Sequence, residues 1–377
     1  MENIKLSKSI VGEEEKRALA EVIDESYLGM GQFTKKFEDK LARYLGVKEV
    51  ICVNSGTSAL HLSLMSILKP GDEVLVQSLT FVACYQAISA CFAIPISCEI
   101  DPKTCLIDLN DAKKRITNKT KAIMPVHYAG RVGDLDKIYD FAREYKLRVI
   151  EDASHSFGTT YKGKKVGSIG DIVCFSFDGI KNITCGEGGA IVSQDNSVLE
   201  YIKDARLLGI HKDTQKRYQG LRSWKFDVSH QGYRYHMSNL FAAIGLVQLD
   251  RLEAEFKPAR QRIAKYYQKM LRPIKGILLF EDDYEQTIPH IFPIRVLDGK
   301  RDLLREYLMD SGIECGIHYY PNHLLTYYGN LKGKLPVTEK IYNQLLSIPL
   351  HPGLTEEDRE YIIENIRKFF ETTGGKK

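Results

Sequence analysis

Short apolar segments recur through the first half of the chain, and several are separated by longer segments with helical spacing. Most of these segments are rich in Val and Ile and lack the alternation of apolar and polar positions that marks a half-exposed strand. Strands covered on both faces have this character. The segments are EVICVN (49–54), DEVLVQ (72–77), IPISCEI (94–100), KAIMPV (121–126), LRVIED (147–152), DIVCFSF (171–177) and GAIVSQ (189–194).

Helical patterns lie between several of these strands. They cover residues 57–68, 81–92 and 135–145, with apolar side chains at helical intervals. Strands that alternate with helices in this way form parallel sheets. The pattern therefore predicts an α/β fold in which a mainly parallel sheet is flanked by helices.

Beyond about residue 250 the pattern changes to longer helices with few strands between them. A chain of 377 residues is also longer than one hydrophobic core usually serves. We therefore predict a large α/β domain over residues 1–250 and a smaller α+β domain over 251–377. The predicted elements of the smaller domain are a helix at 251–270 that breaks at Pro258, a strand at 290–296, a helix at 301–312 and a last helix that opens with a capping box at Thr355 and Asp358.

Composition narrows the range of functions. Hydrophobic residues make up 44% and charged residues 27%, as in ordinary globular proteins, and the net charge of +4 is spread along the chain. This predicts neither a nucleic-acid partner nor a membrane surface. No run of 18 apolar residues and no signal-like N-terminus occurs, so a cytoplasmic protein is expected. The eight cysteines form no C-x-x-C pair, which predicts reduced buried thiols and no metal site.

Ligands of parallel α/β sheets bind at the carboxyl ends of the strands, so the residues that follow each strand are the candidates for chemistry. Gly56, Thr57 and Ser58 follow the first strand and open an apolar helix. A helix start with free N–H groups and hydroxyls can bind a phosphate, or it can simply be well capped. Asp152 ends a buried strand and precedes His155. A buried carboxylate needs a positive partner or strong donors, unless it caps a helix.

Two further strand ends carry candidates. Phe81 follows the second strand, where it could cover a flat ring or pack in the core. Ser176 and Lys181 follow the strand at 171–177 and precede the glycine cluster CGEGG. A lysine in such a place can be desolvated and form a Schiff base, although a single lysine is more often a surface residue.

Taken together, these candidates fit one ligand, pyridoxal 5′-phosphate. Its phosphate needs the helix start at Gly56, its pyridine nitrogen needs Asp152, its ring needs Phe81 and its aldehyde needs Lys181. A lysine Schiff base with an acidic partner for the pyridinium is the expected arrangement for this cofactor.

At these residues the chain resembles the DegT/StrS family of nucleotide-sugar aminotransferases, within the fold type I pyridoxal phosphate enzymes. The resemblance extends over nearly the whole chain, and so many motifs in one order are very unusual by chance. The motifs are IVGEEEKRALAEVI, YLGMGQFTKKFEDKLARYLGV, NSGTSALHLSL, GDEVLVQSLTFVAC, IEDASHSFGTTYKGKKVGSIGDIVCFSF, IKNITCGEGGAIV, HYYPNH and LSIPLHPGLTEEDREYI.

The resemblance implies a role for each candidate. Lys181 matches the Schiff-base lysine, Asp152 the partner of the pyridine nitrogen and His155 the residue beside the phenolic oxygen of the ring. The other matches are Phe81 for the stacking aromatic and Thr57, Ser58 and Ser176 for the phosphate ligands.

The family also implies homodimers with shared active sites. A segment that usually contains the sequence NYR reaches the phosphate of the neighbouring subunit. Here the corresponding segment is GYRYHMSNLFAAIGLVQL, in which Arg234 replaces the usual asparagine and His236 the usual arginine. This departure changes the expected contact between the subunits.

The resemblance thus implies transfer of an amino group, with glutamate as donor, to a nucleotide-linked sugar. The IKNITC motif resembles that of enzymes that aminate C4, which favours a dTDP-linked 4-keto-6-deoxy sugar, as used for surface polysaccharides. His318, Tyr319 and His323 are candidates for the sugar site, or for packing between the domains. Three alternatives remain: a 3-keto-sugar aminotransferase, a dehydratase on the same scaffold, which would usually lack Lys181, and a cofactor-binding regulator without turnover.

Overall fold

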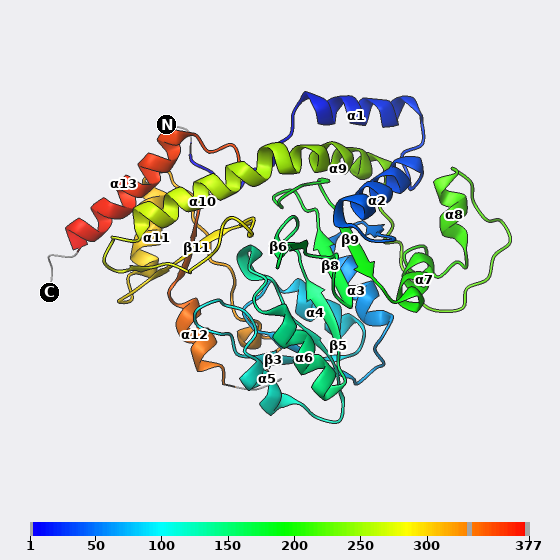
Figure 1. Ribbon diagram of the computed structural model, residues 1–377, viewed down its shortest axis with the longest axis horizontal. Helices are drawn as coiled ribbons and strands as arrows, with labels where there is room; N and C mark the ends of the chain where they lie inside the picture. The colour runs from blue at the N-terminus through cyan, green and yellow to red at the C-terminus, as the bar shows by residue number, and fades with distance from the viewer. Residues whose placement is uncertain (1–2, 330–333, 374–377) are drawn as a thin grey trace.

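The computed structural model describes residues 3–329 and 334–373, and its centre is a seven-stranded sheet (Figure 1). The strand order is β1-β9-β8-β5-β4-β2-β3. All seven strands fall within segments predicted from the apolar pattern, give or take one residue. Their bounds are β1 Ile51–Val53, β2 Glu73–Gln77, β3 Ile94–Cys98, β4 Thr120–Met124, β5 Arg148–Asp152, β8 Ile172–Ser176 and β9 Gly189–Ser193.

The sheet is mainly parallel, as predicted, with one exception. Strands β3, β2, β4, β5 and β8 pair in parallel, whereas β9 is antiparallel to both β8 and β1. Because β9 returns directly from β8 through a loop without a helix, it must run in the opposite direction. The carboxyl ends of β1, β2, β4, β5 and β8 therefore meet at one edge of the sheet.

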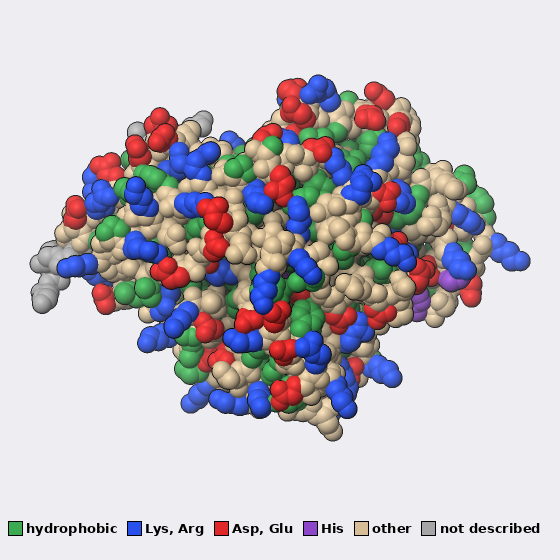
Figure 2. Space-filling model, in the orientation of Figure 1, with side chains coloured by type: hydrophobic (Ala, Val, Ile, Leu, Met, Phe, Trp, Pro, Cys, Tyr) green, Lys and Arg blue, Asp and Glu red, His purple; other side chains and the backbone are tan. Residues whose placement is uncertain are grey.

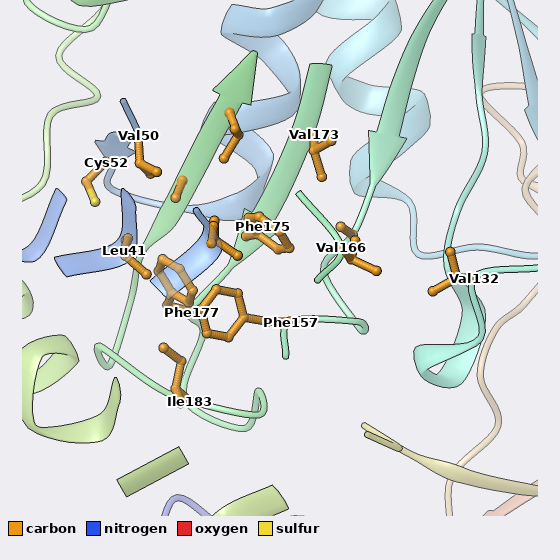
Figure 3. Close-up of a cluster of buried hydrophobic side chains, with 14 of the residues drawn as sticks. Leu41, Val50, Cys52, Val132, Phe157, Val166, Val173, Phe175, Phe177 and Ile183 are labelled. Atoms are coloured by element: carbon orange, nitrogen blue, oxygen red, sulfur yellow. The ribbon is translucent and has the colours of Figure 1, made fainter. Parts of the chain in front are cut away.

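Both faces of the sheet are covered, which explains why its strands are uniformly apolar. Along β8, Val173 and Phe175 pack into one hydrophobic cluster, and Ile172 and Cys174 pack into another on the opposite face. Figure 3 shows the first cluster, in which the ring of Phe157 packs edge-on against the rings of Phe175 and Phe177. Helices α2 (Gln32–Leu45), α6 (Leu135–Tyr145) and α9 (Asn239–Arg251) supply this face, and α3 (Gly56–Met65), α4 (Ala83–Ala90) and α7 (Asn196–Ala205) supply the other.

A long helical rod joins the sheet to the C-terminal part of the chain (Figure 1). It consists of α9, a π-helical turn η2 (Leu252–Phe256) and α10 (Lys257–Leu271). The break predicted at Pro258 is wrong, because the rod continues through this residue. Proline lacks an N–H group and its ring crowds the preceding turn, but it is tolerated in the first turn of a helix. Here the wide π turn directly precedes it.

The C-terminal part has its own sheet and its own core. Strands β10 (Ile277–Leu278), β11 (Phe292–Val296) and β12 (Leu345–Ile348) form an antiparallel sheet packed with α10, α11 (Arg301–Asp310) and α13 (Glu356–Thr373). The predicted capping box is confirmed, since Thr355 and Asp358 exchange hydrogen bonds from backbone N–H to side-chain oxygen. The rod crosses residue 250 without interruption, so the exact domain boundary stays a prediction.

The surface of the protein carries charges of both signs (Figure 2). Figure 2 shows Lys and Arg side chains interspersed with Asp and Glu over the visible face. Within residues 3–329 and 334–373, no helix has the length and apolarity to cross a membrane, and no group of three or more His, Cys, Asp or Glu side chains could hold a metal ion.

The remaining bounds are α1 Glu13–Asp24, α5 Leu109–Arg115, η1 Tyr128–Gly130, β6 Thr160–Tyr161, β7 Lys164–Lys165, α8 Asp213–Tyr218, η3 Asn322–Leu324 and α12 Pro336–Tyr342.

Candidate active site

A cavity of about 480 Å³ opens at the edge of the sheet where the carboxyl ends of the parallel strands meet. Nine of the twelve residues predicted for the site line it. They come from the ends of β1, β2, β5 and β8 and from the chain before η3, which is far away in the sequence. The nine are Gly56, Thr57, Phe81, Asp152, His155, Ser176, Lys181, His318 and Tyr319.

Lys181 lies in a loop between β8 and β9 that folds back on itself. The loop is closed by hydrogen bonds from Phe177 N–H to Gly188 O and from Cys185 N–H to Phe177 O. A Cβ atom at Gly189 would lie 2.4 Å from the carbonyl oxygen of Ser55, so only glycine lets the returning strand pass the turn after β1. The glycines behind Lys181 thus let the chain return closely past the turn that opens the neighbouring helix.

The surroundings of Lys181 favour its neutral form. Burial lowers the pKa of the Lys181 amine below its usual value, although Asp152 and Asp178 act in the opposite direction. A lysine must be neutral to attack a carbonyl group or to accept a proton. Lys181 is therefore suited to both tasks.

Asp152 is buried and every oxygen of its carboxylate accepts a hydrogen bond. Ser154 donates to Oδ1 from its backbone N–H and from its hydroxyl, at 3.1 and 2.6 Å, and the Cys84 thiol donates to Oδ2 at 2.9 Å. No helix directly follows Asp152, so it caps none, whereas strong donors hold its carboxylate and it lines the cavity.

The hydrogen bonds of His155 define which of its ring nitrogens carries the proton. Its Nδ1 accepts a hydrogen bond from the backbone N–H of Ala129 at 3.2 Å, so the ring proton is on Nε2, which is 3.1 Å from the hydroxyl of Tyr319. Burial lowers the pKa of His155 well below its usual value, with the charge of Lys181 as the next cause. His155 is thus a neutral donor at the cavity wall.

The start of α3 forms a small polar cradle. Ser55 is its N-cap and accepts a hydrogen bond from the N–H of Ser58, while Gly56 and Thr57 line the cavity beside Ser176. A Cβ atom at Gly56 would lie 2.7 Å from the Cβ of Ser176, so any other residue would crowd this space. Free N–H groups, hydroxyls and the positive end of a helix dipole suit a phosphate.

Three predicted residues lie outside the cavity wall. The hydroxyl of Ser58 bonds Asn54 Oδ1 at 2.7 Å instead of facing the cavity, and Ser55 takes its place at the wall. His323 is buried between Ser78 and Glu339, with its ring nitrogens 2.7 and 3.3 Å from their oxygens. The side chains of Ser58 and His323 are therefore already engaged within the protein.

Arg234 is the third residue outside the wall. It is exposed and pairs with Leu207 through a backbone bridge. Arg234 therefore does not line the cavity of its own chain.

Two aromatic side chains lie side by side at the cavity, Phe81 after β2 and Tyr319 before η3. The rings of Phe81 and Tyr319 have their centroids 5.6 Å apart, and Phe81 is 55% exposed, which leaves one of its surfaces free for a ligand. His318 donates to or accepts from the Ser347 hydroxyl at 2.8 Å, and burial lowers its pKa to about 4. Neutral rings of this kind can cover a planar group.

Sequence reasoning missed several residues around Lys181. Asp178 and Glu187 line the cavity, and burial and the charge of Asp178 raise the pKa of Glu187. Their positions within the lysine loop were the available signal. His290 has its Nε2 3.4 Å from the Lys181 amine, and Arg260 donates to the carbonyl oxygen of Lys181 at 3.5 Å. Neither has a local signal, because both lie far from the lysine in sequence.

The cavity fits pyridoxal 5′-phosphate on its own chemistry. An amine, a carboxylate held by three donors, a neutral imidazole donor, an exposed aromatic face and a helix start are the groups that such a ligand needs. Because Gly56 has no side chain, Ser176 can approach the start of α3 closely, which brings its hydroxyl to the polar cradle.

Comparisons with known proteins agree with this chemistry. Residues 9–367 match the DegT/DnrJ/EryC1/StrS aminotransferase family. The chain is 38% identical to the GDP-perosamine synthase of Caulobacter vibrioides over 358 residues, 93% of each protein, and 36% identical to an uncharacterised protein of Methanocaldococcus jannaschii over 368 residues, 95% of each. The structure matches a putative sugar aminotransferase from Streptococcus pneumoniae in its pyridoxamine phosphate form, with a TM-score of 0.92, 30% identity and complete coverage of both chains.

These matches cover nearly the whole chain and include the strands and loops that build the cavity. The chain belongs to the DegT/DnrJ/EryC1/StrS aminotransferase family and is a pyridoxal phosphate-dependent sugar aminotransferase.

Proposed function

We propose that this enzyme transfers an amino group from glutamate to the keto carbon of a nucleotide-linked 4-keto-6-deoxy sugar, with dTDP as the nucleotide. The observation that carries the proposal is the position of Lys181, which lines the same cavity as Asp152 and the polar cradle at α3. This arrangement is the one that amino-group transfer needs, and an intact lysine argues against a dehydratase on the same scaffold.

Each residue has a task in the proposed reaction. When bound, the cofactor supplies an electron sink that stabilises negative charge at the carbon next to the transferred nitrogen. Lys181 takes and returns the proton at that carbon as a general acid and base. Asp152 keeps the ring nitrogen protonated, and His155 donates a hydrogen bond from Nε2. Gly56, Thr57 and Ser176 hold the phosphate, Phe81 covers the ring, and His318 and Tyr319 face the sugar.

We propose that the functional unit of the enzyme is a homodimer with shared active sites. Residues 221–228 expose several large apolar side chains, including Trp224, which is 92% exposed, and Phe226, which is 55% exposed. Exposed apolar groups of this size mark interaction surfaces. Arg234 lies a few residues further on and does not reach its own cavity, so we place it at the phosphate of the partner subunit. Light scattering of the purified protein measures the assembly.

A GDP-linked sugar is the second candidate substrate. It is favoured by the 38% identity to a relative whose name specifies GDP as the nucleotide. The two nucleotides differ in both the base and the pentose, and the acidic groups Asp178 and Glu187 at the cavity wall do not distinguish between them. The donor, the nucleotide and the aminated carbon are therefore settled by experiment.

A screen of keto-sugar nucleotides tests the proposal. The purified enzyme is incubated with glutamate and, in turn, dTDP- and GDP-linked 4-keto-6-deoxy sugars and a dTDP-linked 3-keto sugar, and products are identified by mass spectrometry and NMR. The expected product is the 4-amino sugar of the dTDP series, together with 2-oxoglutarate. The visible band of the bound cofactor should bleach with glutamate and return with the sugar.

The outcomes separate the alternatives. Amination of only the GDP-linked sugar, or of C3, would replace the proposed substrate with the corresponding alternative. Loss of a sugar hydroxyl without gain of nitrogen would indicate a dehydratase. A band that responds to no donor would favour a regulator. The Lys181→Ala variant is the control and should form no product.

A further inference from the structure

Arg260, on helix α10, is a buried arginine that lies directly behind the lysine loop. Only 2% of it is exposed. Its guanidinium group donates to the carbonyl oxygens of His290 at 3.1 Å and Lys181 at 3.5 Å. It also donates to the carbonyl oxygens of Pro289 at 3.3 Å and Leu350 at 3.4 Å. One side chain thus holds three segments of the chain together.

Arg260 differs from the other deeply buried arginines in having no acidic partner among the described residues. Arg131 pairs with Asp282, Arg206 with Glu38 and Arg301 with Asp302. Buried charges are normally paired, because an isolated charge is costly in a medium of low dielectric constant. Burial alone lowers the pKa of Arg260 to about 10, which still leaves it charged at neutral pH.

The segments that Arg260 holds include both partners of a contact at the reaction centre. Nε2 of His290 is 3.4 Å from the amine of Lys181, and the backbone carbonyls of these two residues bind the same guanidinium group. His290 is 3% exposed, and its ring lies 4.4 Å from that of His155. Arg260 therefore fixes the loop that carries the amine relative to the segment before β11 that carries the imidazole.

The charge of Arg260 acts on the same amine. Burial is the largest influence on the pKa of Lys181 and lowers it. Asp152 and Asp178 raise this pKa, and Arg260 lowers it. The imidazoles near the amine are neutral, because burial lowers their pKa values. The titratable and charged groups that face Lys181 are Asp152, Asp178, Arg260, Cys84, His155, His290 and His318.

We propose that Arg260 is a positioning residue for the lysine of the active site: its guanidinium group ties the backbone of Lys181 to that of His290 and places a positive charge without an acidic partner behind the amine. The inference rests on the proposed role of Lys181. It explains why the charge is left without an acid. A carboxylate beside Arg260 would cancel its effect on the amine, whereas backbone carbonyls bind the fork and leave the net charge in place.

Two variants separate the charge from the fork. Arg260→Gln removes the charge and keeps an amide that can donate to carbonyl oxygens, whereas Arg260→Lys keeps the charge and loses the planar fork. Arg301→Gln is the matched control, because Arg301 is also buried and donates to the carbonyl oxygens of Tyr342 and Leu345 in the C-terminal part.

The main readout is the pKa of the Lys181 amine itself. Each protein is converted with an amino donor to the form in which this lysine is free, labelled with trace acetic anhydride across a range of pH, and analysed by peptide mass spectrometry. Arg260→Gln should raise the labelling midpoint of Lys181 by roughly one pH unit, the size expected for a nearby like charge. The acid limb of the pH–rate profile of the half-reaction with the donor should move to higher pH by the same amount.

The other variants complete the test. Arg260→Lys should keep the midpoint of the wild type and slow the half-reaction at least about tenfold, through misplacement of the amine. Arg301→Gln should lower the melting temperature and change neither midpoint nor rate. An unchanged midpoint in folded Arg260→Gln, or an equal shift in Arg301→Gln, would overturn the proposal. Labelling reports on Lys181 without the sugar substrate, so a wrong substrate assignment leaves this result intact.

Discussion

The two walls of the cavity are built in different ways. On the sheet side, Gly56, Asp152, Ser176 and Lys181 stand at the ends of neighbouring strands, and local turns hold each of them. The opposite side comes from residues 318–319, with His290 and Arg260 behind the lysine loop, all carried by the C-terminal part of the chain. The sheet side carries the donors for an anion, together with Phe81 and His155, and the opposite side carries the rings of His318 and Tyr319.

This difference suggests a division of labour. Polar groups at strand ends can be placed accurately by the sheet, which suits a cofactor that stays bound. Rings and a buried charge from the C-terminal part control the environment of the amine and the space for the sugar. Variants of the sheet wall should therefore affect the cofactor, and variants of the opposite wall should spare it.

The largest effect is expected for Lys181→Ala on the sheet wall. Turnover should be abolished while the protein stays folded, because Lys181 is the only lysine among the described residues that line the cavity. Reduction of the holoenzyme with borohydride, followed by peptide mapping, should find the cofactor on Lys181. Lys164→Ala, at an exposed lysine in β7, is the control and should retain full activity. Attachment of the cofactor to any other lysine would contradict the role assigned to Lys181.

Asp152→Asn should have the next largest effect on the same wall. The amide can keep the turn with Ser154 but cannot stabilise a protonated ring nitrogen, so the rate of the half-reaction should fall at least about a hundredfold. Cofactor binding should persist, as measured by the visible spectrum after gel filtration. Kinetics close to those of the wild type would reduce Asp152 to a turn-forming residue.

Arg234→Ala tests whether the sheet wall is completed by a second subunit. If its guanidinium binds the partner's phosphate, its loss should weaken cofactor affinity roughly ten- to a hundredfold, or about 1.5–3 kcal/mol. Titration of the apo-protein with pyridoxal phosphate measures this, and light scattering should still detect dimers. Unchanged cofactor affinity with a raised KM for the sugar nucleotide would move Arg234 to the substrate site.

His318→Gln on the opposite wall should have the smallest effect. Cofactor affinity should stay within about twofold, and the KM for the sugar should rise a few-fold. Weakened cofactor binding in this variant would contradict the division between the walls.

The pH dependence of stability gives His318 a second test. Burial lowers its pKa to about 4 in the folded protein, whereas the unfolded chain takes up the proton near pH 6.5. The folded state therefore binds fewer protons between these values, and the stability contributed by neutral His318 is lost as the pH falls from about 6.5 to 4. His318→Gln should remove up to about 3 kcal/mol of this loss, less the screening of a partly exposed ring, and melting curves at pH 7 and pH 4.5 measure it. An identical pH dependence in both proteins would show that the ring is solvated.

The sequence alone determined the sheet and most of the sheet wall. Doubly covered strands must be uniformly apolar, and a strand end followed by a glycine turn or a capped helix is a local feature, so the places of Asp152, Ser176 and Lys181 could be predicted from short segments. Motif order over nearly the whole chain then indicated the family.

Only the tertiary structure decided the rest. The apolar pattern of β9 is the same in either direction, so its antiparallel course depended on the closed loop before it. The hydroxyl of Ser58 bonds Asn54, and the ring of His323 bonds Ser78 and Glu339, so neither side chain lines the cavity. Arg260 and Lys181 are 79 residues apart and share no motif. Their contact arises because the helical rod carries one part of the chain back against the other, and no short-range pattern can encode such packing.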